Sequence, residues 1–281
     1  MPEPVVSRET RTSVNATKED VQKFWEAQAC GERLYLAGTD RPAYEAQAAM
    51  RYALEPYILG FADFGNSRAK RVLEIGIGLG ADHQRFAEAG AALYGIDLTA
   101  RAVAHVRRRL AAFGLASNLL QADAESLPFA SNQFDIVYSW GVLHHSPDTP
   151  KAVAEVRRVL RPGGEARIMI YHKWSVVGAM LWARYGLLRM RPFVPLAEIY
   201  AQHLESPGTK AYTLSEGRAL FEGFTRVDIS IVLTHGDLLT SSAGQRHQGP
   251  LLALARTIWP RRLLSWLAKN HGLFMLIRAV K

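Results

Sequence analysis

The sequence contains very little cysteine: Cys30 is the only one among 281 residues. A single cysteine excludes an intrachain disulfide, and such usage is typical of a reducing compartment. The opening stretch MPEPVVSRET lacks the apolar core of a secretory signal. The best candidate for a membrane span lies between Lys173 and Arg184, where ten uncharged residues are about half of what a spanning helix needs. We therefore expect a cytoplasmic protein whose contact with membranes, if it has any, is peripheral.

Internal repeats and low-complexity tracts are also absent from the sequence. Charged residues account for 21% and hydrophobic residues for 48% of the chain, as in an ordinary globular protein. The net charge of +8 would suit an anionic partner such as nucleic acid, a membrane surface or an acidic substrate. A basic, solvated surface explains the same charge without a partner, so charge alone identifies none.

Short apolar runs alternate with helical runs from Arg71 onward, which predicts a parallel sheet covered by helices on both faces. Expected strands are 71–75, 92–97, 118–123, 134–140, 166–171, 226–233 and 273–280. Expected helices are 17–31, 43–52, one beginning at Pro56, 100–110, 149–160 and 213–224. The predicted fold class is therefore α/β, a Rossmann-like, seven-stranded and mostly parallel sheet.

The same pattern divides the chain into four parts. Residues 1–67 are predicted to be helical, and residues 68–171 to form the alternating core. The alternation breaks at 172–212, where a helical insertion is expected. Residues 213–281 complete the core and carry a second insertion at 235–270.

A glycine-rich turn, E-I-G-I-G-L-G at 74–80, follows the first predicted strand. Such a turn before a helix presents free backbone N–H groups, and glycine lets a ligand approach closely. A phosphate loop for nucleoside triphosphates is excluded, because the turn has no lysine and no Gly-Lys-Ser or Gly-Lys-Thr follows. The turn therefore predicts a different nucleotide-like ligand.

A dinucleotide is harder to exclude, because G-x-G-x-x-A beginning at Gly76 satisfies the relaxed fingerprint and Asp97 ends the second strand. Glu74 argues against it, since a carboxylate just before the glycines would repel a pyrophosphate and favour a cation. Asp123 at the end of the third strand, and L-R-P-G-G-E before the fifth, also differ from the dinucleotide pattern.

The joint pattern resembles the class I S-adenosylmethionine-dependent methyltransferases, closely over residues 68–171 and loosely over the terminal strands. E-I-G-I-G-L-G, G-I-D, A-D-A-E-S-L-P-F, F-D-I-V-Y-S-W-G-V-L-H-H and V-L-R-P-G-G-E follow that family's order and spacing. The chain looks most like the broad, type 11-like branch that methylates small molecules. The resemblance implies S-adenosylmethionine as cofactor, whose sulfonium cation suits a turn with carboxylates nearby. It also implies that residues 1–67 are an N-terminal helical lid, residues 68–171 a cofactor-binding core and residues 172–212 a substrate cap.

The resemblance also implies roles for individual residues. The turn would pack on the methionine portion, Asp97 would accept from both ribose hydroxyls, and Leu98 would pack on the adenine. Asp123 would accept from the adenine amino group, and the Ser139 backbone would meet the methionine ammonium. The whole cofactor-binding set is Glu74, Gly76, Gly78, Gly80, Asp97, Leu98, Asp123, Ala124, Glu125 and Ser139.

The turn after the fourth strand, S-W-G-V-L-H-H, faces the transferred methyl group in this family. His144 and His145 are therefore candidate bases, with purely structural roles as the alternative. A base is needed only if the acceptor loses a proton as it attacks. Tyr171 and His172, at the end of the fifth strand, are further candidates for catalysis and for contact with the acceptor.

The predicted lid offers Trp25, Tyr35 and Tyr44 as aromatic walls of a substrate site. Ordinary packing of an amphipathic helix explains Trp25 equally well. Cys30 has no partner cysteine and is expected to be a small buried residue. We predict no metal site.

Both insertions combine Trp and Leu with Arg, which suits a helix on an anionic membrane or the mouth of a lipid-binding site. The alternative is that their apolar faces pack on the sheet. We expect methyl transfer to an O, N, S or C nucleophile of a small organic molecule. A hydrophobic or lipidic acceptor is one form of this prediction. An RNA methyltransferase and a non-catalytic cofactor-fold binding protein are the alternatives, although no RNA-binding module is visible and nucleic acid is not an expected partner. Oligomeric state is not specified by the sequence.

Overall fold

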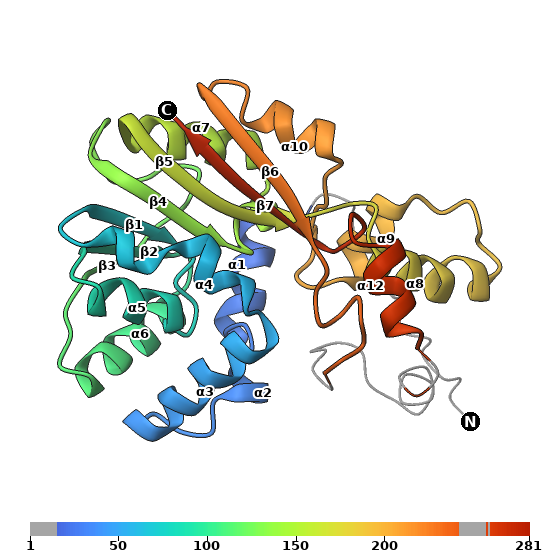
Figure 1. The fold of residues 1–281 in the computed structure, drawn as a ribbon, viewed down its shortest axis with the longest axis horizontal. Coiled ribbons are helices and arrows are strands. Elements are labelled where there is room, and N and C mark those ends of the chain that lie inside the picture. Colours follow the sequence, from blue (N-terminus) through green and yellow to red (C-terminus); the bar gives the residue numbers. More distant parts are fainter. Residues whose placement is uncertain (1–15, 242–256, 258) are drawn as a thin grey trace, which may run out of the picture.

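The computed structural model describes residues 16–241, 257 and 259–281. Its centre is a seven-stranded sheet in the order β3-β2-β1-β4-β5-β7-β6 (Figure 1). The strands are β1 (Arg71–Ile75), β2 (Ala92–Asp97), β3 (Asn118–Gln121), β4 (Phe134–Trp140), β5 (Leu160–Tyr171), β6 (Arg226–Val232) and β7 (Phe274–Val280). β7 is antiparallel to β5 and β6, and the other pairs are parallel. The predicted Rossmann-like, mostly parallel sheet is confirmed.

Helices precede the sheet, cover it and extend beyond one end of it (Figure 1). The N-terminal segment contains α1 (Lys18–Ala27), α2 (Glu32–Tyr35), α3 (Arg41–Leu54), α4 (Tyr57–Ala62) and η1 (Phe64–Ser67). The core contains α5 (Ala81–Glu88), α6 (Ala100–Ala112), η2 (Leu143–His145), α7 (Thr149–Val159) and α10 (Leu214–Leu220). Residues 172–212 contain α8 (Val176–Tyr185), η3 (Leu187–Arg189) and α9 (Leu196–His203), and α12 (Arg261–Leu267) precedes β7. Part of the predicted insertion 235–270, namely 242–256 and 258, lies outside the described residues.

Local capping signals fix the start of several helices. Thr17 with Asp20 and Thr213 with Glu216 form capping boxes, in which each side chain satisfies a free backbone N–H at the start of its helix. The first helix ends four residues before Gly31, where it was expected to stop, because Gln28 is already extended. Gly31, with φ of 74°, begins α2 instead.

The fifth strand is longer than predicted. It begins at Leu160 and includes the Pro-Gly-Gly stretch, whereas the predicted helix extended to residue 160 and the predicted strand began at Ala166. The β4–β5 register shifts between the Phe134–Leu160 and Ile136–Glu165 pairs, and Gly163 has φ of 73°. The extra residues therefore form a bulge within the strand, which the positive φ of glycine allows.

Both faces of the sheet are buried, which explains why its strands read as near-continuous apolar runs. Leu73 and Val137 face α7 and its Val156, whereas Val72 and Tyr138 face the opposite layer with Phe86 of α5. The strand order reverses between β1 and β4, so the carboxyl edge of the sheet opens a crevice at this point.

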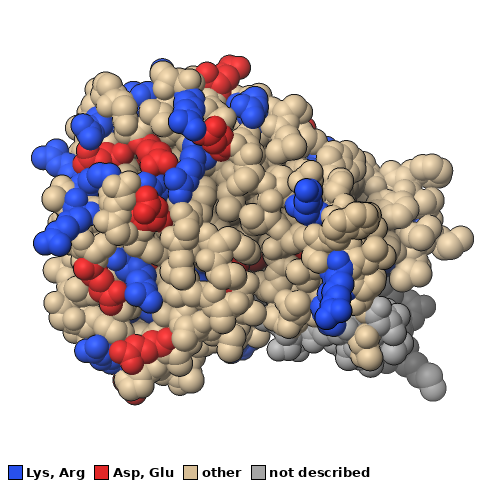
Figure 2. Space-filling model, in the orientation of Figure 1, with Lys and Arg blue, Asp and Glu red and all other residues tan. Residues whose placement is uncertain are grey.

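Charged side chains are distributed unevenly over the face of the molecule shown in Figure 2. Lysine, arginine and acidic side chains crowd the part of this face that overlies the core, and the part with α8, α9 and α12 shows few charges. None of the described helices has the length and apolar character that a membrane span requires.

Candidate active site

A cavity of about 680 Å³ opens at the carboxyl edge of the sheet. One end, the turn end, is formed by the glycine turn, Asp97 and Asp123; the other, the insertion end, by Tyr171, Glu205, α8 and Trp259. The predicted site residues that line it are Trp25, Tyr35, Glu74, Gly76, Gly78, Gly80, Asp97, Leu98, Asp123, Ala124, His145 and Tyr171. Tyr44, Glu125, Ser139, His144 and His172 are not among the lining residues.

The glycine turn has the backbone that only glycine adopts easily. Gly76 and Gly80 have φ of 79° and 78°, and a Cβ at Gly76 would come within 2.1 Å of the Val142 side chain. At Gly78 a Cβ would meet no heavy atom of the described residues within 4 Å, because this position faces the cavity. The turn thus packs tightly on one side and exposes its backbone on the other.

Asp97 is held rigidly but keeps acceptor capacity. Its Oδ1 accepts from the Thr99 backbone N–H at 3.0 Å and from the Thr99 hydroxyl at 2.7 Å. In the described part of the chain its Oδ2 accepts only from the Gly78 N–H, at 3.3 Å. Burial raises the pKa of Asp97, against the lowering effect of these hydrogen bonds. The carboxylate therefore has room for donors from a ligand.

Glu74 differs from our expectation of a charged group. Its carboxyl oxygen is 2.8 Å from Nδ1 of His83, and both side chains are buried. Burial, together with the nearby charge of Asp82, raises the pKa of Glu74 well above its usual value. Burial also lowers the pKa of His83 to about 3. Glu74 lines the cavity, and its raised pKa favours the uncharged carboxyl, which weakens our argument from a negative charge at this position.

Three polar residues of α1 fasten this helix beside the turn end. Lys18 Nζ contacts the carboxylates of Asp123 at 2.5 Å and Glu125 at 2.8 Å. The Gln22 amide donates to the Leu98 carbonyl at 3.1 Å. Further along α1, Glu26 accepts from the first backbone N–H groups of α6. These contacts hold α1 across the carboxyl edge, and sequence reasoning missed Lys18.

Glu125 lies behind the carboxyl edge of the sheet and stabilises the loops there. Besides Lys18, its carboxylate accepts from the Ser146 hydroxyl at 2.5 Å and from the Asp148 N–H at 2.9 Å. It thereby joins the third strand's loop to the start of α7. Direct contact of this side chain with a ligand in the cavity, which we predicted, is not supported by the structure.

An ionic network forms the floor between the two ends. Arg51 of α3 pairs with Asp82 of α5 at 2.6 Å, and Asp82 also accepts from the hydroxyls of Tyr52 and Tyr138. Although burial opposes ionisation, Arg51 and these hydroxyls hold the pKa of Asp82 below its usual value. Next to it, burial raises the pKa of Glu55 to about 7. The network fixes α3 against the core.

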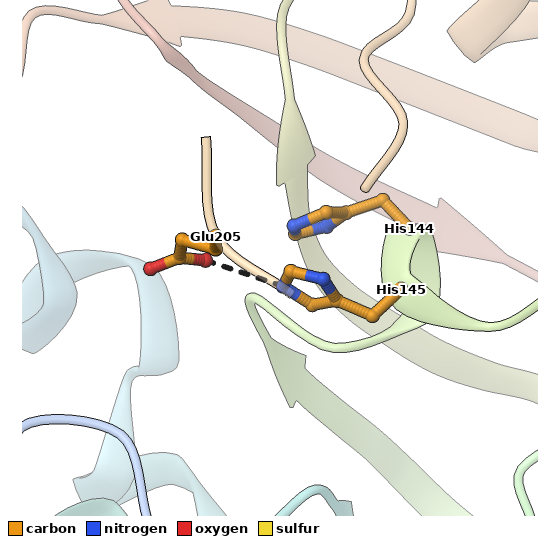
Figure 3. A group of neighbouring side chains, drawn as sticks. All are labelled: His144, His145 and Glu205. Atoms are coloured by element: carbon orange, nitrogen blue, oxygen red, sulfur yellow. Dashed lines mark ion pairs between the residues drawn. The ribbon is translucent and has the colours of Figure 1, made fainter. Parts of the chain in front are cut away.

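His145 and Glu205 meet in the cavity wall (Figure 3). Nε2 of His145 is 3.3 Å from the Glu205 carboxylate, and Nδ1 is 2.8 Å from the Ser206 hydroxyl and 3.1 Å from that of Thr209. The Thr209 hydroxyl gives its own hydrogen to the Ser206 carbonyl at 2.7 Å, so it accepts from Nδ1–H. Nε2 then carries the lone pair.

Two hydrogen-bond acceptors therefore face each other without a donor between them. Within the described residues Nε2 of His145 has no hydrogen-bond partner, and the Glu205 carboxylate accepts from the Tyr171 hydroxyl at 2.6 Å. His145 is buried and Glu205 is half-buried, so a proton or a ligand donor between them would satisfy both acceptors. Glu205 lies in the 172–212 insertion, and sequence reasoning missed it.

His144 lies behind this pair. Its ring is 4.0 Å from the Tyr171 ring, and neither ring nitrogen has a partner among the described residues. Burial, with the charges of His145 and Lys210, lowers the pKa of His144 well below its usual value. Ligand atoms of His144, His145 and Glu205 lie within 4.8 Å of one another, whereas tetrahedral zinc ligands lie about 3.4 Å apart. A metal would require these side chains to move together.

Other predicted residues serve the scaffold. Tyr44 is fully buried and packs under the Arg109 guanidinium, 5.1 Å from its ring centroid. The Ser139 hydroxyl donates to the Ile75 carbonyl, so Ser139 stays within the sheet while Trp140 and Gly141 line the cavity. His172 is buried, and its Nδ1 is 3.1 Å from the Gly272 carbonyl. The predicted wall role of Tyr44 and acceptor contact of His172 do not match these positions.

Cys30, by contrast, is accessible because it faces the cavity. Burial among the surrounding protein atoms raises the pKa of its thiol to about 12. Trp25 lies on the same side, with its ring 5.5 Å from that of His145. The N-terminal helices thus contribute directly to the cavity wall.

Comparison with known proteins agrees with this architecture. Residues 73–168 match the family model of a methyltransferase domain. The malonyl-[acyl-carrier protein] O-methyltransferase of Enterobacter lignolyticus is 38% identical over 97 residues, which cover 34% of this chain and 37% of that protein. The phthiotriol/phenolphthiotriol dimycocerosates methyltransferase of Mycobacterium leprae is 39% identical over 101 residues, covering 35% and 37%. The match therefore spans little more than a third of these relatives' length.

A solved structure extends the likeness in fold. Phosphoethanolamine N-methyltransferase 2 of Haemonchus contortus, in complex with S-adenosyl-L-methionine, superposes with a TM-score of 0.56 at 18% identity. The superposition covers 80% of this chain and 52% of that one. The matched domain, the strand order and the crevice at the carboxyl edge all indicate the same fold. Residues 73–168 therefore form a methyltransferase domain, on the Rossmann-like fold of the class I S-adenosylmethionine-dependent methyltransferases.

Proposed function

We propose that this protein methylates a hydroxyl or amine group of a small, largely apolar molecule bound at the insertion end of the cavity. The observation that carries the proposal is the pair of facing acceptors, His145 Nε2 and Glu205, 3.3 Å apart in the cavity wall. An O–H or N–H donor of the methyl acceptor would satisfy both groups. A carbon or sulfur nucleophile would leave them unsatisfied.

The turn end fits the cofactor that the family uses. The open space over Gly78 admits a ligand close to the backbone, and Asp97 has a free acceptor oxygen for a ribose diol. Leu98 and Ala124 offer apolar surface, and Asp123 a carboxylate, where an adenine would lie. Burial raises the pKa of Glu74 and so favours its uncharged form, which would not repel a methionine carboxylate. We assign these residues to S-adenosylmethionine.

When bound, S-adenosylmethionine supplies an electrophilic methyl group on a sulfonium, which a nucleophile displaces in line. The residues of the chain position the acceptor and control its proton. His145 would take the proton at Nε2 as the acceptor attacks, and Ser206 and Thr209 hold the ring in the required tautomer. Glu205, 3.3 Å from the same nitrogen, would then accept a hydrogen bond from Nε2–H and stabilise the imidazolium that results.

The N-terminal segment acts in this proposal as a lid. Lys18, Gln22 and Glu26 attach α1 to the loops that follow β2 and β3, and Trp25 and Cys30 face the cavity. Burying the site under α1 excludes water from it, which strengthens every polar contact inside. The helices of 172–212 cap the acceptor from the other side.

The lining favours an apolar acceptor without a carboxylate. The cavity wall at the insertion end includes Met180, Leu181, Leu188 and Trp259. The cation deepest in the site, Arg51, is already paired with Asp82, and Glu205 would repel an acceptor carboxylate. The matched relatives are named for a malonyl-acyl carrier and for lipid-like dimycocerosates, and the lining agrees better with the second.

Isotope-labelled S-adenosylmethionine tests the proposal. The full chain is incubated with it and with organic and aqueous extracts of the source cells, and labelled products are identified by mass spectrometry. We expect an O- or N-methylated product, and a decrease in rate of roughly 10²–10⁴-fold for His145→Ala. His271→Ala, an exposed histidine outside this cavity, is the matched control.

Three results would contradict the proposal. Cofactor binding by calorimetry without any labelled product would indicate a non-catalytic binding protein. A labelled RNA would indicate the other alternative. Loss of turnover on treatment with a chelator, restored by a divalent metal, would replace the base by a metal held at His144, His145 and Glu205.

A further inference from the structure

The segment between α8 and α9 exposes large apolar side chains. Leu187, Leu188, Met190 and Phe193 follow one another around η3, and Phe193 and Met190 are 95% and 88% exposed. Leu263, Trp266 and Leu267 of α12 are exposed as well, with Trp266 at 74%. We name these seven residues the apolar rim. Scattered exposed leucines are ordinary, but so many large side chains in two short segments mark an interaction surface.

The two segments of the apolar rim both border the mouth of the cavity. Leu188 is exposed on the surface and also lines the cavity. Trp259, just before α12, lines the same cavity and donates to the Asp237 carbonyl. After α12, the His271 carbonyl accepts from the first N–H of α8, at Val176. The rim therefore reaches the insertion end through Leu188 in one segment and lies next to Trp259 in the other.

The charged residues around the apolar rim are predominantly basic. Residues 173–203 contain Lys173, Arg184, Arg189 and Arg191 against the single acid Glu198, which pairs with Arg191. Residues 259–270 contain two arginines and a lysine and no acid. The core, by contrast, shows both signs side by side (Figure 2). An apolar surface within a basic border is complementary to an anionic lipid surface.

We propose that the apolar rim inserts into the interface of an anionic lipid membrane, and that the acceptor enters the cavity from that membrane. The second half rests on the proposed function; the first half does not. Phe193, Met190 and Trp266 would enter the boundary between headgroups and acyl chains, while Arg184, Arg189 and Arg262 would contact lipid phosphates. Leu188 would then connect the acyl region with the cavity wall.

A lipid surface explains the rim better than an acidic carrier protein does. Basic residues would serve either partner, but a protein interface of ordinary composition has aromatic anchors that fit pockets, surrounded by a polar rim. Here the most exposed groups are flexible Met190 and fully projecting Phe193, which suit a fluid phase. A carrier protein is therefore the alternative outcome of the test.

Vesicle flotation with the full chain tests the proposal. Vesicles of phosphatidylcholine alone are compared with vesicles that also contain phosphatidylglycerol. We expect binding to the anionic vesicles, at least tenfold weaker binding to neutral ones, and release by salt. Met190→Glu should weaken binding at least tenfold, whereas Met50→Glu, at an exposed methionine of α3 outside the rim, should leave it unchanged.

A second pair of variants isolates the contribution of charge. Arg262→Glu should weaken binding to anionic vesicles about fivefold or more, and Arg107→Glu, exposed on α6, should not. Cofactor affinity, measured by calorimetry on the same preparations, should stay constant and shows that each variant is folded.

Equal binding of the wild type to neutral and anionic vesicles, or equal effects of the rim and control variants, would overturn the proposal. So would absence of vesicle binding together with binding of an acidic acyl carrier protein to the rim. None of these outcomes bears on whether the chain transfers methyl groups, because the labelling experiment decides that separately.

Discussion

The turn end and the insertion end of the cavity are built in different ways. At the turn end, backbone geometry and paired polar groups determine the shape: Gly76 packs on Val142, Asp97 is held by Thr99, and Lys18 pairs with Asp123. At the insertion end, apolar side chains surround His145 and Glu205, whose acceptor atoms lack a shared donor. The first end is complete as folded, and the second requires its ligand. Enzymes of one family can therefore share the first and vary the second.

Asp97→Ala should have the largest effect and should act on the turn end alone. Loss of a charged acceptor for two hydroxyls should weaken cofactor binding by about 3 kcal/mol or more, a factor above a hundred. Calorimetry measures the affinity, and thermal unfolding checks the fold. Asp228→Ala, on the exposed face of β6, is the control. Unchanged affinity would mean that Asp97 only caps α6.

Glu205→Gln should act on the insertion end alone. Glutamine keeps the shape and still accepts from Tyr171, but it cannot stabilise a charged His145. We expect kcat to fall about ten- to a hundredfold with unchanged cofactor affinity. Glu198→Gln on α9 provides the comparison within the same insertion. A parallel loss of cofactor affinity would contradict the separation of the two ends.

Glu55→Gln tests the floor between the two ends of the cavity through the pH dependence of stability. Burial raises the pKa of Glu55 to about 7, so the folded protein binds a proton that the unfolded chain releases at lower pH. The wild type should therefore lose stability as pH rises from about 5 to 8, relative to the glutamine variant. We expect a difference on the order of 2 kcal/mol at pH 8 and none near pH 4, by urea unfolding.

Exposed Glu45, changed to glutamine, should show no such pH-dependent difference. If Glu55→Gln also showed none, Glu55 would be ionised in the fold, and the insertion end would carry a second negative charge beside Glu205.

Lys18→Met should have the smallest effect. It tests the attachment of α1, the helix that connects the two ends of the cavity. Removing the ion pairs with Asp123 and Glu125 should loosen the helix and weaken cofactor binding about fivefold, through faster release. Lys23→Met, on the same helix with only an exposed partner, should change nothing. Tighter binding instead would show that Lys18 competes with the ligand for Asp123.

The turn end could be predicted from the sequence because its signals are local. β1, β2 and β4 begin and end at the predicted residues, and the glycine turn and Asp97 follow directly from strand ends. Glu74 shows the limit of this reasoning: it lines the cavity as expected, but burial raises the pKa of its carboxyl and so opposes the charge that we assigned to it.

The insertion end could not be predicted because it brings together distant segments. Glu205 reaches His145 across 59 intervening positions of the chain, and no spacing rule connects them. The prediction for Tyr44 was wrong for a related reason. Its helix was predicted correctly, but packing determines that the Tyr44 side chain faces Arg109. Tyr171 and His172 are neighbours on alternate sides of a strand end, and only the first faces the cavity.

Cys30 gives the cavity a built-in chemical reporter. With a thiol pKa of about 12, only about one molecule in ten thousand carries a thiolate at pH 8, so alkylating reagents should label the wild type slowly. No second thiol contributes background, because the sequence has none. The rate of maleimide incorporation should therefore rise when α1 detaches and fall when a ligand fills the chamber, which allows occupancy to be followed by mass spectrometry before any substrate is known.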